Sequence, residues 1–124
     1  MNQITLAVRD FEEGVSFLST IGLRQIVHNS EGHYARFELP SGSATFSIHE
    51  SKTANPGDAT IYFEVDDVHR RYRELLAAGI NFDSPPTDQD WRWCEAHFCD
   101  PTGNRFCLYH AGLDRRFPPW RLVG

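Results

Sequence analysis

Hydrophobic and polar residues alternate along several short stretches of this chain, which is the pattern of strands that bury one face. Ile4, Leu6 and Val8 show it first, between polar or small neighbours. Gly and Pro residues such as Pro56 and Gly57 interrupt the stretches and indicate turns. We therefore expect strands at residues 3–8, 23–27, 33–39, 44–49, 60–65, 80–82, 95–99 and 105–109.

Two stretches have helical periodicity instead, and each follows a strand. Asp10 precedes the first stretch and Asp67 the second. An aspartate at this position accepts hydrogen bonds from the free N–H groups at the start of a helix. We expect helices from Asp10 to about Gly22 and from Asp67 to about Gly79.

The two halves of the chain repeat this pattern at a fixed distance. Val8 corresponds to Val65 and Gly22 to Gly79, with the same offset (65 − 8 = 79 − 22 = 57). A repeated unit that cannot bury its hydrophobic face alone packs against its copy, usually leaving a cleft. We predict one α+β domain of two β-α-β-β-β modules in a pseudo-twofold arrangement. Its parts are repeat 1 at 1–50, a linker at 51–57, repeat 2 at 58–110 and an extended, proline-containing tail at 111–124.

Composition limits the classes of function. With 124 residues, 40% of them hydrophobic, the chain has enough apolar material for one core. The net charge is −5, and no run of Lys or Arg is longer than a pair such as Arg115-Arg116, so we expect neither a nucleic-acid nor a membrane partner. The first residues lack the features of a leader, and we expect a cytoplasmic protein. Three cysteines without Cys-x-x-Cys spacing argue against a disulfide framework and against a thiolate zinc site.

Two motifs extend the repeat into a family resemblance. Phe63-Glu64-Val65-Asp66-Asp67 enters the second helix, and Asp100-Pro101-Thr102-Gly103-Asn104 forms the last hairpin turn, where Gly103 is expected at positive φ. With the duplicated modules, they resemble the vicinal oxygen chelate superfamily, which includes glyoxalase I, extradiol dioxygenases, fosfomycin-resistance enzymes and bleomycin resistance proteins. The resemblance implies a curved mixed sheet around a central cleft and, for a small bacterial member, a homodimer.

The resemblance also indicates where a metal would bind. Metal-dependent members hold a divalent ion with two histidines and one glutamate, and the corresponding positions here are Gln3, Thr60 and Cys107. Gln and Thr oxygens are weak neutral ligands, and one thiol would supply the only negative charge. We therefore expect no cofactor and no metal at these positions.

Strand alternation identifies the side chains that face the cleft. The face opposite the helices is polar and aromatic, and a loop with two tryptophans leads onto it. The candidate ligand-binding residues are Tyr34, Arg36, His49, Tyr62, Glu64, Trp91, Trp93, Glu95 and Tyr109. Aromatic rings with nearby carboxylates suit a flat or cationic organic ligand.

Two functions remain open. The first is metal-free binding of a small organic molecule, as in the bleomycin resistance branch. The alternative is a lyase, isomerase or dioxygenase that uses a displaced metal site of His49, Glu95 and His97, or acid–base catalysis by Glu95 and His97. Cys107 could be a nucleophile, but no adjacent group that would lower its pKa is visible, so a structural role is favoured. A vestigial cleft on a protein that acts through its dimer surface has no positive feature behind it.

Overall fold

The computed structural model describes all residues, 1–124, and the chain divides into two compact units. Unit 1 comprises Met1–Ala59 and Cys99–Asn104, and unit 2 comprises Thr60–Phe98 and Arg105–Gly124. Each unit is described by itself below.

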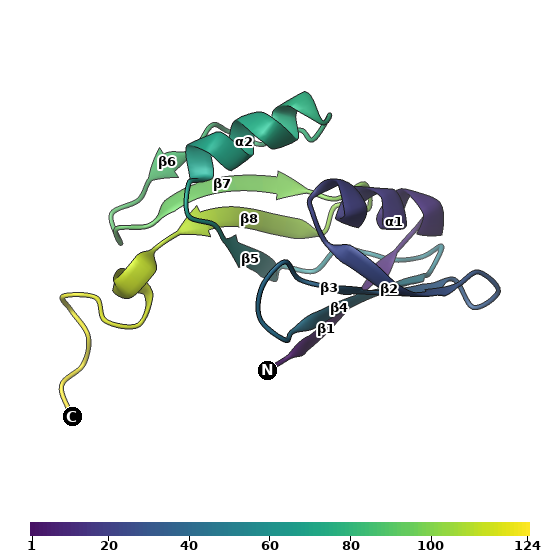
Figure 1. The fold of residues 1–124 in the computed structure, drawn as a ribbon, viewed down its shortest axis with the longest axis horizontal. Helices are drawn as coiled ribbons and strands as arrows, with labels where there is room; N and C mark the ends of the chain where they lie inside the picture. Colours follow the sequence, from purple (N-terminus) through teal and green to yellow (C-terminus); the bar gives the residue numbers. More distant parts are fainter. The chain divides into compact units, whose positions relative to one another are not determined.

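Unit 1 contains one helix on a four-stranded mixed sheet (Figure 1). Its elements are β1 (Gln3–Val8), α1 (Phe11–Thr20), β2 (Arg24–Asn29), β3 (Tyr34–Glu38) and β4 (Thr45–Glu50). The strand order is β1-β4-β3-β2, with β1 parallel to β4 and the other pairs antiparallel. Helix α1 covers one face of this sheet.

Unit 2 has the same order of elements. They are β5 (Thr60–Glu64), α2 (Val68–Ala77), β6 (Thr87–Asp88), β7 (Cys94–Cys99) and β8 (Arg105–His110). The strand order β5-β8-β7-β6 matches that of unit 1, and β5 is again parallel to the last strand. The fold is therefore α+β, with a strand, a helix and three strands in each unit.

Both helices begin and end as the sequence predicts. The Asp10 side chain accepts a hydrogen bond from the Glu13 amide at 2.9 Å, and Asp67 accepts one from the Arg70 amide at 3.0 Å. Each cap satisfies an N–H group that has no partner within its helix. Gly22 follows α1 at φ 106°, so a residue without a side chain makes the left-handed turn there.

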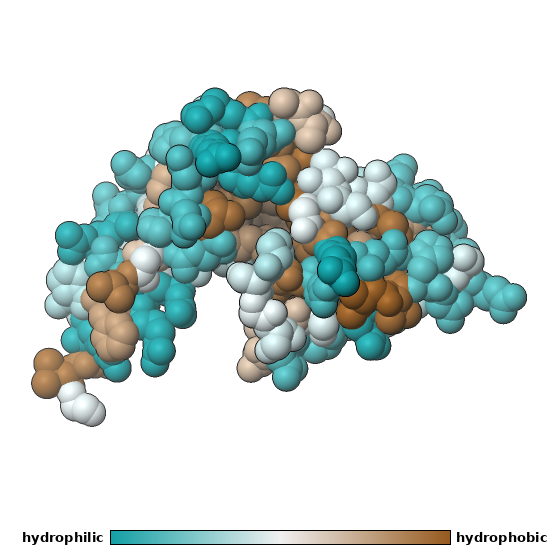
Figure 2. Space-filling view, in the orientation of Figure 1, coloured by the Kyte–Doolittle hydropathy of each residue, from teal (hydrophilic) through white to brown (hydrophobic).

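The core of each unit lies between its helix and its sheet. In β3, Ala35 and Phe37 are buried, whereas Arg36 between them is exposed. In unit 2 the largest fully buried side chains include Phe98 and Phe106. Burying one such ring contributes about 1.5–3 kcal/mol. The outward side of α2 is hydrophilic (Figure 2), which leaves its apolar side for the sheet.

The segment between α2 and β7 differs from the expected strand at 80–82. The Ile80 amide donates to the Leu75 carbonyl at 3.0 Å, so it closes the helix end and cannot join a strand ladder. Only Phe82 pairs with a strand, through a single bridge to Phe98. The loop after it contains the two-residue strand β6, which pairs with β7.

The tail differs from the expected extended chain at its start. Gly112–Arg115 form a 3₁₀ helix, and the Phe117 amide donates to the Leu113 carbonyl at 2.8 Å. Proline restricts the chain only near Pro118 and Pro119, so the residues before them are free to turn. The end of the tail is hydrophobic and exposed (Figure 2). No helix in the structure has the length and apolar character needed to cross a membrane.

Candidate functional site

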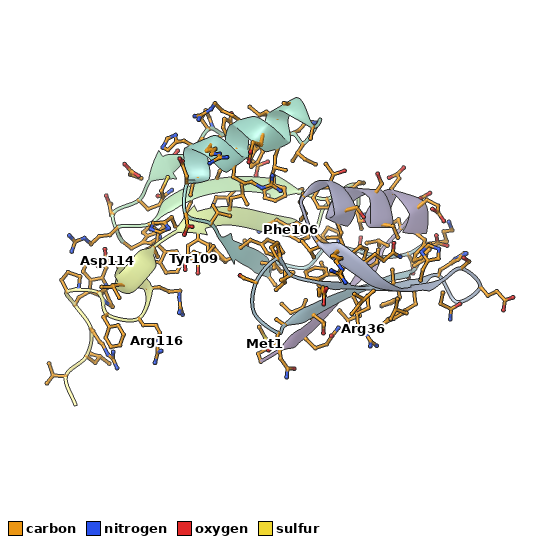
Figure 3. The ribbon with its side chains drawn as sticks, in the orientation of Figure 1. Met1, Arg36, Phe106, Tyr109, Asp114 and Arg116 are labelled. Atoms are coloured by element: carbon orange, nitrogen blue, oxygen red, sulfur yellow. The ribbon has the colours of Figure 1, made fainter.

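The face of the unit 2 sheet opposite α2 carries most of the candidate residues. Strands β5, β7 and β8 each place alternate side chains on it. These side chains are Tyr62, Glu64, Glu95, His97, Cys107 and Tyr109. In the parallel pair, Tyr62 lies beside Cys107 and Glu64 beside Tyr109. Tyr109 lies on the side of β8 away from α2 (Figure 3).

Three rings on this face, Tyr62, Trp93 and Tyr109, form an aromatic cluster. The centroids of Trp93 and Tyr109 are 4.8 Å apart, and Tyr62 lies edge-on to Tyr109 at 5.4 Å and to Trp93 at 5.9 Å. Tyr109 is buried, whereas 43% of Tyr62 is exposed. The cluster therefore has a supported base and one ring that a ligand can reach.

A turn with left-handed backbone conformation positions both tryptophans. Arg92 has φ 72°, which costs on the order of 1–2 kcal/mol for a residue other than glycine. Its amide donates to the Gln89 carbonyl at 2.9 Å, and its guanidinium lies 3.6 Å from the Asp114 carboxylate. These contacts hold the turn between Trp91 and Trp93.

Glu95 and His97 form a close pair beside the cluster. His97 Nε2 and Glu95 Oε1 are 2.8 Å apart, and the Trp91 indole N–H donates to Glu95 Oε2 at 2.7 Å. The Glu95 side chain is only 3% exposed, but that of His97 is 38% exposed. A carboxylate that orients an accessible imidazole is an arrangement capable of general acid–base chemistry.

Cys107 belongs to the same group. One ligand-type atom from each of Glu95, His97 and Cys107 lies within 4.8 Å of the others. Burial, followed by the nearby Glu95 charge, raises the pKa of the Cys107 thiol to about 12, although the Ala96 N–H opposes the shift. The thiol is therefore protonated at neutral pH, which argues against Cys107 as a free nucleophile.

Glu64 has a role in the fold that the sequence analysis did not identify. Its Oε2 accepts hydrogen bonds from the amides of Ala111 at 2.8 Å and Gly112 at 2.9 Å. Burial opposes ionisation, but these two N–H groups, together with the nearby His110 and Arg115, outweigh it and lower the pKa of Glu64. Glu95 is buried with both oxygens engaged, whereas Glu64 binds the tail through Oε2 and keeps a side chain that is 35% exposed.

The corresponding face of the unit 1 sheet carries a network of hydroxyl and amide groups. Tyr34 and Ser47 share a hydrogen bond of 2.7 Å, and Arg36 donates to the Tyr34 hydroxyl at 3.0 Å. The Ser47 hydrogen bond, with a contribution from Arg36, lowers the pKa of Tyr34 against a smaller opposing effect of burial. Arg36 lies on the side of the sheet away from α1 (Figure 3). His49 is exposed on β4 of the same unit.

The three positions that the resemblance assigns to metal ligands, Gln3, Thr60 and Cys107, have different surroundings. The Gln3 amide nitrogen donates to Ser47 Oγ at 2.9 Å, and its oxygen accepts from the Thr45 hydroxyl. Both ends of the amide are therefore engaged by β4. Thr60 is the first residue of β5, and Cys107 lies with Glu95 and His97.

The structure adds one contact that the sequence analysis does not expect. The sequence analysis considers Cys107 with Gln3 and Thr60, and it considers Glu95 and His97 either as a pair or together with His49. Strands β7 and β8 are neighbours in one sheet, and this pairing brings Cys107 to Glu95 and His97 within unit 2. The hairpin motif 100–104 was the signal that could have shown it, because residues on the two arms of a hairpin face one another.

Comparisons with known proteins agree with the fold. A sequence model of the Glyoxalase/Bleomycin resistance protein/Dioxygenase superfamily matches residues 1–108. The uncharacterized protein YraH of Bacillus subtilis (strain 168) is 30% identical over 121 residues, covering 86% of this chain and 94% of that protein.

Solved structures with a similar fold are also found. A superfamily member from Sphaerobacter thermophilus DSM 20745 has a TM-score of 0.75 and 22% identity, covering 90% of this chain and 96% of its own. A bleomycin-binding protein in complex with bleomycin has a TM-score of 0.71 and 20% identity, covering 90% of this chain and 97% of its own.

Proposed function

The chain belongs to the Glyoxalase/Bleomycin resistance protein/Dioxygenase superfamily, and on this premise we propose that it binds a small, flat organic molecule on the aromatic cluster of unit 2. A planar ligand would stack on Tyr62, with Trp91 beside it. Both rings are nearly half exposed, at 43% and 47%. Such a ligand would bury aromatic surface that water now covers.

The observation that carries this proposal is the gathering of Tyr62, Trp93 and Tyr109 within 6 Å of one another on one sheet face. Rings that serve only the core are buried, and Tyr62 is not. The complex of a bleomycin-binding protein with bleomycin, a structure with a similar fold, supports ligand binding as the activity. Fold alone does not identify the ligand.

We further propose that binding does not use the family's metal positions. Gln3 would have to give up its hydrogen bonds to Ser47 and Thr45 to coordinate an ion. A neutral amide gains little from coordination in return. Thr60 offers another neutral oxygen.

The test is a titration of the full chain with acridine as a planar probe and with bleomycin. We expect the probe to quench tryptophan fluorescence, and calorimetry to give saturable binding. Replacing the exposed ring in Tyr62→Leu should weaken binding about 10-fold, because a base-like ring stacked on an aromatic side chain contributes about 1–3 kcal/mol. Trp120→Leu is the matched control, since Trp120 is also exposed but lies in the tail. Equal affinity in both variants, or no binding of either probe, would contradict the proposal.

An enzyme remains the second candidate, and the Glu95–His97 pair is the observation that favours it. A lyase or isomerase reaction would use His97 as the acid or base, with Glu95 orienting it, whereas a dioxygenase would also need a metal to activate oxygen. Screening with glyoxalase and extradiol dioxygenase substrates would test this candidate. Any activity should be lost in His97→Gln and kept in His69→Gln, a matched exposed histidine on α2.

We also propose a homodimer. The tail exposes large apolar side chains, and such groups usually find a partner surface. They are Leu113, Phe117, Trp120, Leu122 and Val123. Light scattering should give twice the chain mass for the full protein and the single chain mass for a protein ending at Gly112. A full-length monomer at every concentration would contradict the dimer.

A further inference from the structure

We propose that Glu95, His97 and Cys107 form a binding site for a single zinc ion within unit 2. The site is distinct from the family positions, since it shares only Cys107 with them. It does not depend on the proposed binding of an organic molecule. It shares Glu95 and His97 with the displaced site that the sequence leaves as an alternative, and its third ligand is Cys107.

The three donor atoms are already close enough for one ion. One atom from each residue lies within 4.8 Å of the others, and His97 Nε2 is 2.8 Å from Glu95 Oε1. Ligand atoms around tetrahedral zinc are about 3.3–3.8 Å apart, given bond lengths of about 2.0–2.3 Å. Shifts of about 1 Å or less in side chains would therefore seat the ion. Zinc would replace the hydrogen bond between Glu95 and His97.

The chemistry of the donors selects zinc. A thiolate, an imidazole and a carboxylate together suit a borderline-soft ion, and Mg²⁺ or Ca²⁺ would reject the sulfur. Coordination removes the thiol proton of Cys107, which passes to solvent, and leaves a neutral site of one dication with two anionic ligands. His97 binds as the neutral imidazole. Three protein ligands leave the fourth position for water or for a ligand atom.

Groups around the donors have the arrangement expected of a supported metal site. The Trp91 indole donates to Glu95 Oε2 at 2.7 Å, which fixes the carboxylate and leaves Oε1 toward His97. The Ala96 backbone N–H interacts with the Cys107 sulfur and would stabilise a thiolate. Hydrogen bonds of this kind orient ligands and typically change metal affinity 10-fold to 100-fold. Glu95 and Cys107 are both buried, so the ion would be shielded from water on the side of the sheet.

The first test is Co²⁺ substitution, because cobalt reports its ligands spectroscopically. The full chain, stripped of metal with a chelator and kept reduced, is titrated with Co²⁺. We expect a near-ultraviolet charge-transfer band from the cobalt–thiolate bond, saturating at one ion per chain. Added Zn²⁺ should abolish the band by displacement.

Cysteine variants test which thiol binds the ion. Cys107→Ser should lose the charge-transfer band and weaken Zn²⁺ binding, measured against a chromophoric chelator, by about 100-fold or more. Cys94→Ser is the matched control, since Cys94 is a partly buried thiol on the same strand as Glu95 and His97. It should keep both the band and the affinity. His97→Gln should weaken binding while keeping the thiol.

Thermal melting distinguishes a variant that has lost the zinc site from one that has lost its fold. Zn²⁺ should raise the melting temperature of the wild type and of Cys94→Ser, because an ion that binds only the folded chain stabilises it. It should not raise that of Cys107→Ser or His97→Gln, both of which should still melt cooperatively. Absence of the cobalt band in the folded wild type, or its loss in Cys94→Ser instead of Cys107→Ser, would overturn the proposal. Acridine binding without a cobalt band would retain the proposed function and reject only the zinc site.

Discussion

Gly103 lies against the ring of Pro56: a Cβ added to this glycine would be 3.2 Å from Pro56 Cγ. Its φ of 101° is in the left-handed region that other residues avoid, as the hairpin motif predicts. Two independent constraints therefore require glycine in this turn.

Gly103→Val should lower the free energy of unfolding by about 1–3 kcal/mol, because it combines backbone strain with a clash. Urea denaturation measures the change. Gly57→Val is the matched control, since an added Cβ at Gly57 has no neighbour within 4 Å and its φ is ordinary. Equal midpoints for the two variants would show that neither constraint contributes.

The capping aspartate of α2 gives a second prediction. Asp67→Ala removes the acceptor for the Arg70 amide and should cost about 1 kcal/mol of stability. Asp66→Ala, the adjacent carboxylate, removes the same charge without removing the cap and should cost clearly less. A larger effect at Asp66 would mean that charge at the helix start matters more than the hydrogen bond.

The hydrogen bonds that Glu64 accepts from the tail predict that the stability of the fold depends on pH. The folded chain lowers the pKa of this carboxyl below its ordinary 4.5, so its stabilising effect is complete above that value and disappears as the pH falls through the folded pKa. Glu64→Ala should therefore cost about 1 kcal/mol at pH 7, and this cost should shrink as the pH is lowered below 4.5. Thermal melts of wild type and variant over this pH range provide the comparison. Glu31→Ala, which removes a carboxylate from an exposed turn, is the matched control.

The burial of Cys107 predicts that its thiol reacts more slowly with alkylating reagents than the exposed thiol of Cys99. Burial raises its pKa from 9.0 to about 12, so in the reduced, metal-free protein the thiolate fraction near pH 8 is about 10⁻⁴. Iodoacetamide should label the exposed Cys99 within minutes and leave Cys107 unlabelled until the chain unfolds. Mass spectrometry of peptides distinguishes the sites. Labelling of native Cys107 at the rate of Cys99 would show that the thiol is accessible.

Local signals in the sequence were enough for most of the fold. Asp10 and Asp67 marked the helix starts because their side chains act within three residues of their own position. The prediction of a strand at 80–82 was wrong because the Ile80 amide donates a hydrogen bond to the Leu75 carbonyl. A pattern of apolar residues does not indicate such a bond. Local patterns also gave no sign that the tail would begin with a 3₁₀ helix.

The candidate site was harder to predict because it depends on contacts between strands. Alternation placed Tyr62, Glu95 and Tyr109 on one face, but it did not show that Glu64 would bind the backbone of Ala111. Nor did it show that Cys107 would join Glu95 instead of acting alone. Alternation specifies a face, whereas neighbours on that face are specified by the order and register of the strands.

The Gln3 amide, held by Ser47 and Thr45, has a consequence for protein engineering. Installing histidine at position 3, where the resemblance places a metal ligand, would remove the amide that both hydroxyls bind. A successful graft would need small apolar residues at 45 and 47 as well as the histidine, and Ser47 also supports Tyr34. Grafting a metal ligand here would therefore take several substitutions made together, because substitutions within one hydrogen-bond network are not independent in their effect on stability.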